Sequence, residues 1–293
     1  MTTADGAAHS ALGDWAVLFK SRITSFVGFS SWAGAMLAGA EFPRALEAAL
    51  WISALSAASG AFNQVVEREH DARMARTRNR PIPSGRVSVR TAVVVAGVLT
   101  LGAVAALALR FEPLAALLGL GTLVSYVLVY TPLKRTTSLN TVVGAIPGAM
   151  PPLLGAVAVA GAPGTWGWVL FGTIFAWQFP HFLAIAWLYR DDYAAAGMRM
   201  LPSIPGTEGM AGRQAFYYCL ALLPIPLMPM LRGEATLFYG VGALFVGLVY
   251  LVASLRFALE ENPRTARTLL YVSLAHLPFV IGFALADRAL FSI

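Results

Sequence analysis

Charged side chains are scarce in this chain of 293 residues: Asp, Glu, Lys and Arg make up 12% of it. A soluble globular domain carries about twice that share. Cysteine is nearly absent too, because Cys219 stands alone, and this excludes an intrachain disulfide. Residues 1–16 lack the charged start and apolar core of a cleavable signal peptide, and they lack the Arg-rich pattern of a transit peptide. Together these absences exclude a soluble domain and a disulfide-stabilised secreted one.

Apolar residues dominate instead, since 58% of the chain is hydrophobic and the mean hydropathy is +0.68. They fall into blocks near the length that crosses a bilayer core, about 20 residues. Gly and Pro inside several blocks are tolerated in membrane helices. We predict an all-α integral membrane protein with nine transmembrane helices, at 23–40, 46–66, 89–109, 113–131, 139–161, 165–188, 214–231, 235–255 and 269–287.

The basic residues between these blocks are distributed unequally. With nine spans, the connections on one side hold 17 Lys and Arg residues, and those on the other side hold 4. Cytoplasmic loops carry the excess of Lys and Arg, so the N-terminus is predicted inside and the C-terminus outside. The net charge of +6 then follows mainly from topology, and nucleic acid is not needed as a partner. We expect a multi-pass protein of a bacterial inner membrane.

Two connections on the inner side are long, at 67–88 and 189–213, whereas the outer ones are very short. Long connections on one side only indicate the functional face. Residues 1–18 are predicted to form a cytoplasmic tail, and 19–293 a single membrane domain, because no linker is long enough to divide it.

Oxygen-bearing side chains mark the end of the second predicted span. Asn63, Glu67 and Asp71 are spaced by four residues, so on an α-helix they project from one face. Carboxylate and amide oxygens suit Mg²⁺, which proteins usually bind through carboxylates and substrate phosphates. The competing interpretation is a solvated helix end with capping acids.

A second polar group ends the sixth predicted span, in the stretch HFLAIAWLYRDDY at 181–193. His181 lies inside the span, one turn after Trp177. If the helix is continuous, Asp192 lies near the face of His181, and Asp191 lies about 80° away. An ionisable residue within a span is a candidate functional residue. A neutral His181 bonded to a neighbouring helix is the alternative.

Basic residues accompany both acidic groups on the predicted inner side. Arg78, Arg80 and Lys134, together with Arg22, are candidates to clamp the oxygens of a phosphate. Any single arginine of the first inner loop is better explained as an anchor that keeps the loop in the cytoplasm. As a group they predict a site for a divalent metal and a polyanion at the lip of an apolar cavity, which fits a diphosphate with a hydrocarbon tail.

Five stretches carry a resemblance to a known family. The N-x-x-x-[DE]-x-x-x-D pattern at 63–71 is followed by NRPIPSGRVS at 79–88, and FKSRITSF at 19–26 precedes both. YTPLKRTTSLNTVVGAIPGAMPPLLGA at 130–156 and WQFPHFLAIAWLYRDDYAAAGMRMLP at 177–202 are longer and more specific. The chain resembles the UbiA-type intramembrane prenyltransferases over about 19–285, and within them the protohaem IX farnesyltransferase branch, the haem O synthases.

The resemblance implies a nine-helix bundle around a central cavity and transfer of a farnesyl group from farnesyl diphosphate to a vinyl group of haem b, with water addition, giving haem O. Mg²⁺ is the implied cofactor. The implied metal ligands are Asn63, Glu67, Asp71, Asp191 and Asp192. The implied diphosphate-binding residues are Arg22, Arg78, Arg80 and Lys134. Tyr130 matches a family position near the reacting carbon. Glu67 stands where aspartate is commoner. The second motif lacks a D-x-x-x-D spacing, so the resemblance leaves open whether Asp191, Asp192 or both bind the metal.

Haem needs contacts of its own, and His181, then His70, with Trp177 as a flat wall, are the candidates. The implied partners are farnesyl diphosphate, haem b and the lipid bilayer, with haem A synthase or oxidase assembly proteins as further contacts. Two rival functions remain: prenylation of a quinone precursor by the same diphosphate site, and haem or ion transport without chemistry.

Overall fold

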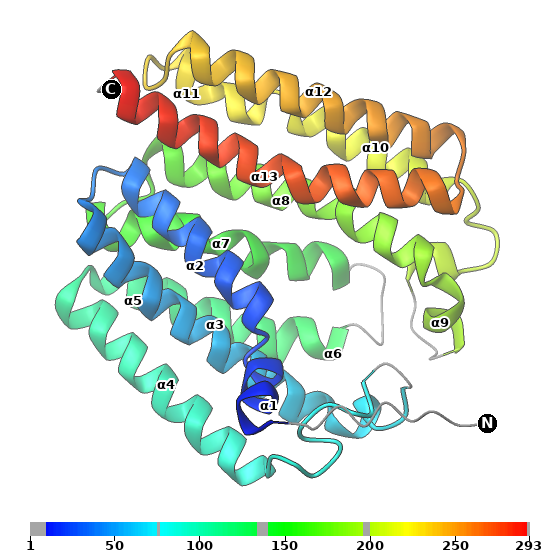
Figure 1. Cartoon of the computed structure of the whole chain (residues 1–293). Coiled ribbons are helices and arrows are strands. Elements are labelled where there is room, and N and C mark those ends of the chain that lie inside the picture. The colour runs from blue at the N-terminus through cyan, green and yellow to red at the C-terminus, as the bar shows by residue number, and fades with distance from the viewer. Residues whose placement is uncertain (1–9, 75–76, 134–139, 196–199, 292–293) are drawn as a thin grey trace.

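A computed structural model describes residues 10–74, 77–133, 140–195 and 200–291, and within these ranges the chain is helical without strands (Figure 1). Successive helices run back and forth along one direction, because most connections between them are short. In chain order the elements are α1 (Ala11–Leu18), α2 (Ser21–Leu37), α3 (Phe42–Asp71), α4 (Val89–Arg110), α5 (Pro113–Val124), the π-helix η1 (Ser125–Tyr130), α6 (Thr131–Leu133), α7 (Asn140–Ala160), α8 (Gly164–Leu188), α9 (Arg190–Ala195), the 3₁₀ turn η2 (Leu201–Ser203), α10 (Met210–Leu222), η3 (Ile225–Leu227), α11 (Met228–Leu231), α12 (Leu237–Leu259) and α13 (Pro263–Phe291).

Eight stretches of the described chain are long and apolar enough to cross a membrane. They are Phe42–Asp71, Val89–Arg110, Pro113–Leu133, Asn140–Ala160, Gly164–Leu188, Met210–Leu231, Leu237–Leu259 and Pro263–Phe291. Each of them coincides with one predicted block. The first predicted block, 23–40, corresponds to α2, a helix of 17 residues. Eight of the nine predicted spans therefore have the helices that a multi-pass membrane protein needs, and the ninth stays a prediction.

Small residues let α2 and α7 approach at backbone distance. A side chain at Gly34 would collide with the Pro152 carbonyl oxygen, and one at Gly155 with the Ser31 carbonyl oxygen. Without a hydrophobic driving force in lipid, close approach of this kind is a main source of helix association. It places α7, which is largely buried and contains three prolines, against α2 in the interior of the bundle.

The helices form two groups that meet along α7 and α8. In Figure 1, α2 to α5 and α7 lie on one side, and α8, α10, α12 and α13 lie on the other. The second group is held together by hydrogen bonds as well as packing: the Trp177 indole of α8 donates to the Ser273 carbonyl of α13 at 2.7 Å. Arg288 of α13 donates to the Leu37 carbonyl at the end of α2 at 3.0 Å, which links the two groups.

The N-terminal segment is fastened to the loop that follows α3. The short helix α1 lies within the predicted tail, and Ser10 caps it by accepting a hydrogen bond from the Gly13 amide at 3.0 Å. The guanidinium of Arg86 contacts both carboxylate oxygens of Asp14, at 2.9 and 3.0 Å. The short helix α1 is thereby held against the loop between α3 and α4.

Candidate active site

The helix α3 runs without a break to Asp71, as the absence of proline in 60–72 predicts. Asn63, Glu67 and Asp71 therefore do lie on one helical face at its C-terminal end. Asn63 is fully buried, Glu67 is half-buried, and Asp71 is only 4% exposed. Polar side chains buried at this depth need partners, because an unpaired polar group away from water is strongly unfavourable.

The amide of Asn63 has partners on both sides. Its Oδ1 accepts a hydrogen bond from the Lys20 ammonium at 2.6 Å, and its Nδ2 donates to the Thr131 hydroxyl at 3.0 Å. That hydroxyl in turn donates to the Tyr126 carbonyl at 2.9 Å. The π-helix η1 also pairs the Tyr126 carbonyl with the backbone amide of Thr131, five residues later in the chain. This carbonyl therefore accepts from both the amide and the hydroxyl of Thr131. A π-turn at this position thus supports the amide of Asn63.

Asp71 is held by the loop that follows it. Arg80 donates to Asp71 Oδ2 at 2.7 Å, and the Thr77 hydroxyl donates to the Asp71 carbonyl at 3.0 Å. The loop therefore folds back on the end of α3, and it brings Arg80 beside the predicted acidic face. Arg78 and Arg22 have exposed side chains. Lys134, the fourth predicted phosphate-binding residue, lies outside the described residues.

The second acidic group is placed differently from the prediction. A continuous helix through 181–192 is wrong, because α8 ends at Leu188 and Tyr189 adopts φ −112°, ψ 22°. Asp191 and Asp192 instead begin the six-residue helix α9 with exposed side chains. The face shared by His181 and Asp192 therefore does not exist. Carboxylates early in a helix are favoured by the peptide dipoles, which explains their position.

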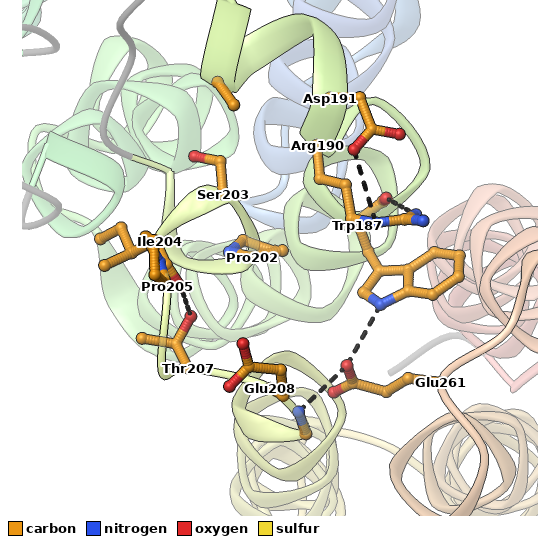
Figure 2. Close-up of a pocket in the computed structure, with 12 residues that line it drawn as sticks. Trp187, Arg190, Asp191, Pro202, Ser203, Ile204, Pro205, Thr207, Glu208 and Glu261 are labelled. Atoms are coloured by element: carbon orange, nitrogen blue, oxygen red, sulfur yellow. Dashed lines mark hydrogen bonds and ion pairs between the residues drawn. The ribbon is translucent and has the colours of Figure 1, made fainter.

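A pocket of about 590 Å³ opens beside Asp191, between the end of α8 and the segment that precedes α10. Figure 2 shows the Trp187 indole pointing toward Glu261 at one edge of this pocket. Glu261 accepts hydrogen bonds from Trp187 Nε1 at 3.1 Å and from the amides of Gly209 and Gly212 at 3.3 and 2.6 Å. One carboxylate thus caps α10 and fixes the end of α8.

A second, narrower cleft lies deeper in the first group of helices. It measures about 120 Å³ and is lined mainly by apolar side chains of α2, α3, α5 and α7. Lys20 and Tyr126 belong to its lining, so the residue whose ammonium holds Asn63 also borders this cleft. Tyr130 lies next to it: its ring is 5.2 Å from that of Tyr126 and fits against Gly144, where a side chain would overlap it.

The predicted haem contacts His181 and Trp177 are brought together. Their rings stack at 4.7 Å and 20°, and His181 Nδ1 lies 2.8 Å from the Ser273 hydroxyl. That hydroxyl donates to the Leu270 carbonyl at 2.5 Å. The contact with Ser273 engages Nδ1 of His181, so Nε2 is the ring nitrogen left for another partner.

The other two described histidines are placed less favourably. His70 belongs to the end of α3 rather than to the Trp177 wall, and its buried Nδ1 has no hydrogen-bond partner among the described residues. His276 is fully buried against the Tyr250 ring, 5.1 Å away, and neither of its ring nitrogens has a partner in the described part of the chain.

The predicted metal ligands do not form one closed cluster. Within the described ranges, no group of three or more His, Cys, Asp and Glu side chains is close enough to hold a metal ion. Asn63 and Asp71 are already engaged by Lys20 and Arg80, and Asp191 points into solvent with 92% of its side chain exposed. The chemistry of the donors still fits Mg²⁺, because all are amide or carboxylate oxygens. Their assembly requires that some of these contacts be exchanged.

Three residues at this site were not singled out from the sequence: Lys20, Tyr126 and Thr131. Lys20 entered the prediction as one of the basic residues on the inner side and as part of FKSRITSF, without a role of its own. Lysine is scarce in this chain, which has two lysines and nineteen arginines. This scarcity is a signal that could have identified Lys20. Tyr126 and Thr131 gave no such signal, since their role depends on the π-turn.

Comparisons with known proteins find a matching family, similar sequences and similar folds. The profile of the UbiA prenyltransferase family matches residues 25–277. A protohaem IX farnesyltransferase of Solibacter usitatus is 41% identical over 277 residues, which is 94% of each chain. Among solved structures, a digeranylgeranylglyceryl phosphate synthase aligns with a TM-score of 0.80 at 14% identity, covering 94% of this chain and 98% of the other. A UbiA homologue of Archaeoglobus fulgidus, bound to DMAPP and Mg²⁺, aligns with a TM-score of 0.64 at 15% identity, covering 94% and 99%.

Proposed function

The chain belongs to the UbiA prenyltransferase family, and from this membership we propose that it transfers a farnesyl group from farnesyl diphosphate to a vinyl group of haem b. The observation that carries the proposal is the 41% identity, across 94% of both chains, to a relative named protohaem IX farnesyltransferase. The likeness to a structure that binds DMAPP and Mg²⁺ supports the choice of a prenyl diphosphate as donor.

The proposed reaction breaks the bond between C1 of the farnesyl group and the diphosphate oxygen. The vinyl group of haem b then supplies the electron pair for a new carbon–carbon bond to C1. Water adds to the carbocation left beside the porphyrin and loses a proton, which gives the hydroxyethylfarnesyl group of haem O and releases diphosphate. The vinyl group is itself the nucleophile, so bond formation needs no strong base from the protein.

Asn63, Glu67 and Asp71 are the residues that would hold Mg²⁺ from the first group of helices, and Asp191 or Asp192 from the second. The oxygen donors on one face of α3 support this assignment. When bound, Mg²⁺ acts as a Lewis acid that stabilises the charge developing on diphosphate.

The cations of the site bind diphosphate oxygens that the metal does not. Arg80 is proposed to exchange part of its contact with Asp71 for a phosphate oxygen, and Arg78 and Arg22, both exposed, are free to turn toward the same anion. Lys134 has the same proposed role. Fixed positive charges around a leaving group are usually the largest contribution to catalysis. Tyr130 lies beside the apolar cleft, and its ring face is proposed to stabilise the allylic cation.

His181 and Trp177 are the proposed haem contacts. Nδ1 of His181 is engaged by Ser273 at 2.8 Å, so Nε2 is the ring nitrogen proposed to meet haem iron or a propionate. A histidine whose other nitrogen donates a hydrogen bond is oriented as a ligand. The indole of Trp177, stacked on the imidazole, supplies a flat apolar surface for the macrocycle. His70 is the second choice, because it lies on the other group of helices.

The proposed membrane arrangement has nine spans with α2 as the first, the N-terminus in the cytoplasm and the C-terminus outside. The excess of basic residues in alternate connections supports this orientation. Residues 19–293 then form one prenyltransferase domain in a bacterial inner membrane, with 1–18 as its cytoplasmic extension and with the diphosphate site on the cytoplasmic side. Haem A synthase or oxidase assembly proteins are proposed to receive the product.

The activity can be tested with membranes that contain the protein. They are incubated with haem b, farnesyl diphosphate and Mg²⁺, and the haems are separated by chromatography. We expect a haem O peak that disappears when farnesyl diphosphate or Mg²⁺ is left out. Prenylation of an aromatic acid without any haem O would contradict the proposal and favour a quinone precursor as the acceptor. No product with either acceptor would point to transport.

A further inference from the structure

Lys20 has an unusual backbone conformation between α1 and α2. With φ 49° and ψ 50° it is in the left-handed region, the only non-glycine residue of the described chain with a positive φ. This conformation is unfavourable for a residue with a side chain and persists only where surrounding contacts enforce it. It turns the chain between two helices and lets the lysine side chain run along Gly60, which leaves room for its Cγ and Cδ.

The ammonium of Lys20 reaches a neutral, half-buried environment. It donates to Asn63 Oδ1 at 2.6 Å and to the Tyr126 hydroxyl at 3.0 Å, and it lies 5.4 Å from the centre of the Tyr126 ring. Among the described residues, no carboxylate is within ion-pair distance of it. A partly desolvated cation is normally paired with an anion. Lys20 is therefore a cation whose natural counter-ion is an anionic ligand.

The contact with Asn63 also decides which atom a metal can use. An ammonium only donates, and Asn63 Nδ2 is committed to Thr131, so the oxygen of the amide must be the atom that faces Lys20. This is the same oxygen that would ligate Mg²⁺ under the proposed function. Two cations on one amide oxygen repel each other at this distance, so lysine and metal exclude one another.

We propose that Lys20 occupies the metal-ligating oxygen of Asn63 in the substrate-free enzyme and exchanges it for a phosphate oxygen when a prenyl diphosphate arrives. The inference rests on the proposed function, since it takes Asn63 to be a metal ligand. Lys20 then acts as a positioning residue before binding and as a diphosphate-binding residue afterwards. It makes metal binding depend on the diphosphate, because only an anion can draw the ammonium away.

The adjoining cleft indicates what kind of anion fits. Lys20 lines the cleft together with Ile23 and Val27 of α2, Leu55 of α3 and Leu123 of α5. A free phosphate would satisfy the ammonium but leave these apolar side chains uncovered. An allylic diphosphate satisfies both, because its hydrocarbon begins directly beside its phosphates. The Lys20 ammonium and the apolar lining of the cleft together therefore favour a prenyl diphosphate over inorganic diphosphate.

The test uses Mn²⁺ in place of Mg²⁺, measured by the electron paramagnetic resonance signal of the free ion, with full-length protein in detergent. Lys20→Met keeps the length of the side chain and removes its charge. We expect it to bind Mn²⁺ alone at least tenfold more tightly than the unaltered protein and farnesyl diphosphate at least tenfold more weakly. Lys20→Arg is expected to keep both affinities within about threefold, because it keeps the charge.

Arg288→Met is the matched control, because it removes a cation that bonds the opposite end of α2. Neither affinity should change in it. A purely structural role for Lys20 would weaken both affinities, so the opposite signs are decisive. If Lys20→Met does not fold, Lys20→Gln, which keeps a hydrogen-bond donor, is expected to show the same two opposite changes.

An unchanged or weaker Mn²⁺ affinity in the uncharged variants would overturn the inference, even if the enzyme makes haem O. An unaltered protein that binds no Mn²⁺ in the presence of farnesyl diphosphate would overturn the metal assignment itself, and the inference with it. Lys20 is proposed to block Mn²⁺ binding until a diphosphate arrives. If inorganic diphosphate restored Mn²⁺ binding to the same extent as farnesyl diphosphate, the role assigned to the cleft would be overturned.

Discussion

The ends of α3 and α8 both carry acidic side chains, but they hold them in opposite ways. At the end of α3, Asp71 is buried and receives a hydrogen bond from Arg80 at 2.7 Å, and Asn63 is bonded on both sides of its amide. At the end of α8, Asp191 and Asp192 are exposed, and Asp191 lies 4.0 Å from Arg190 Nε. One end is preorganised, and the other can still move.

The cause of this difference is the continuity of the helix. In α3 the backbone stays helical to Asp71, so polar side chains project inward from a rigid support. In α8 the helix ends at Leu188, and Glu261 holds the last turn through Trp187 rather than through the acids. Under the proposed function, the side chains at the end of α3 have to exchange the partners they already hold, whereas the exposed acids of α9 have to be brought to the ligand.

The largest effect is expected at the preorganised end. Asp71→Asn removes the charge that pairs with Arg80 and that would bind metal, and it should lower kcat by roughly 100-fold. Haem O formation at saturating farnesyl diphosphate measures this. Glu69→Gln is the matched control, because Glu69 is exposed on the same helix and its ion pair in the described chain is with the exposed Arg68; it should stay within about twofold. Normal haem O formation in Asp71→Asn would remove Asp71 from the site.

The adaptable end should respond less to single changes. Asp191→Asn and Asp192→Asn should each lower kcat by about tenfold or less, because either exposed carboxylate can take the place of the other, and the double variant should approach Asp71→Asn. The same haem O assay, with all three variants side by side, measures this. A double variant with unaltered kcat would show that Asp191 and Asp192 are not metal ligands. The difference between the ends of α3 and α8 would then have no bearing on metal binding.

The two ends can also be compared through the proposed contacts to the acceptor, haem b: His181 on α8 and His70 on α3. His181→Ala should raise KM for haem b by about fivefold, the value of roughly one hydrogen bond, without changing KM for farnesyl diphosphate. His70→Ala, at the other lip, should change both values by less than about twofold. Equal increases in both KM values for His181→Ala would indicate a loss of folded structure rather than a lost haem contact.

The smallest effect is expected from the bond that holds the end of α8. Trp187→Phe keeps the packing against Phe257 and loses the hydrogen bond to Glu261, which should remove about 1 kcal/mol of stability and lower Tm by about 2 °C. Trp168→Phe, at a residue that is 58% exposed, is the control and should leave Tm unchanged. Thermal unfolding in detergent measures both. Identical Tm values would show that Glu261 holds this end through its backbone contacts alone.

Much of the architecture could be predicted from the order of residues. Apolar blocks of bilayer length predicted eight stretches that are helical in the structure, because in lipid each backbone polar group must be paired within its own segment. The absence of proline in 60–72 predicted the continuation of α3, and with it the common face of Asn63, Glu67 and Asp71. The stacking of Trp177 on His181 agrees with their spacing of one turn.

The prediction failed where the outcome depended on contacts between distant segments. Nothing local in LYRDDY marks the break at Tyr189, because the sequence there has no proline or glycine; the end of α8 is fixed by Glu261, which lies 74 residues away from Trp187. The same applies to Lys20, whose partners Asn63 and Tyr126 lie 43 and 106 residues away. Its left-handed backbone cannot be read from FKSR.

The sequence by itself determined that this chain is a helical membrane protein of the prenyltransferase family, and that oxygen donors and arginines gather at one end of its second long helix. These features follow from hydropathy and helical periodicity, which act over neighbouring residues. Only the tertiary structure decided which donors are bonded, to what, and at what depth. In particular, it decided that an ammonium holds the oxygen of Asn63, because a half-buried polar group takes whichever partner the packing of α2 and α3 brings within reach.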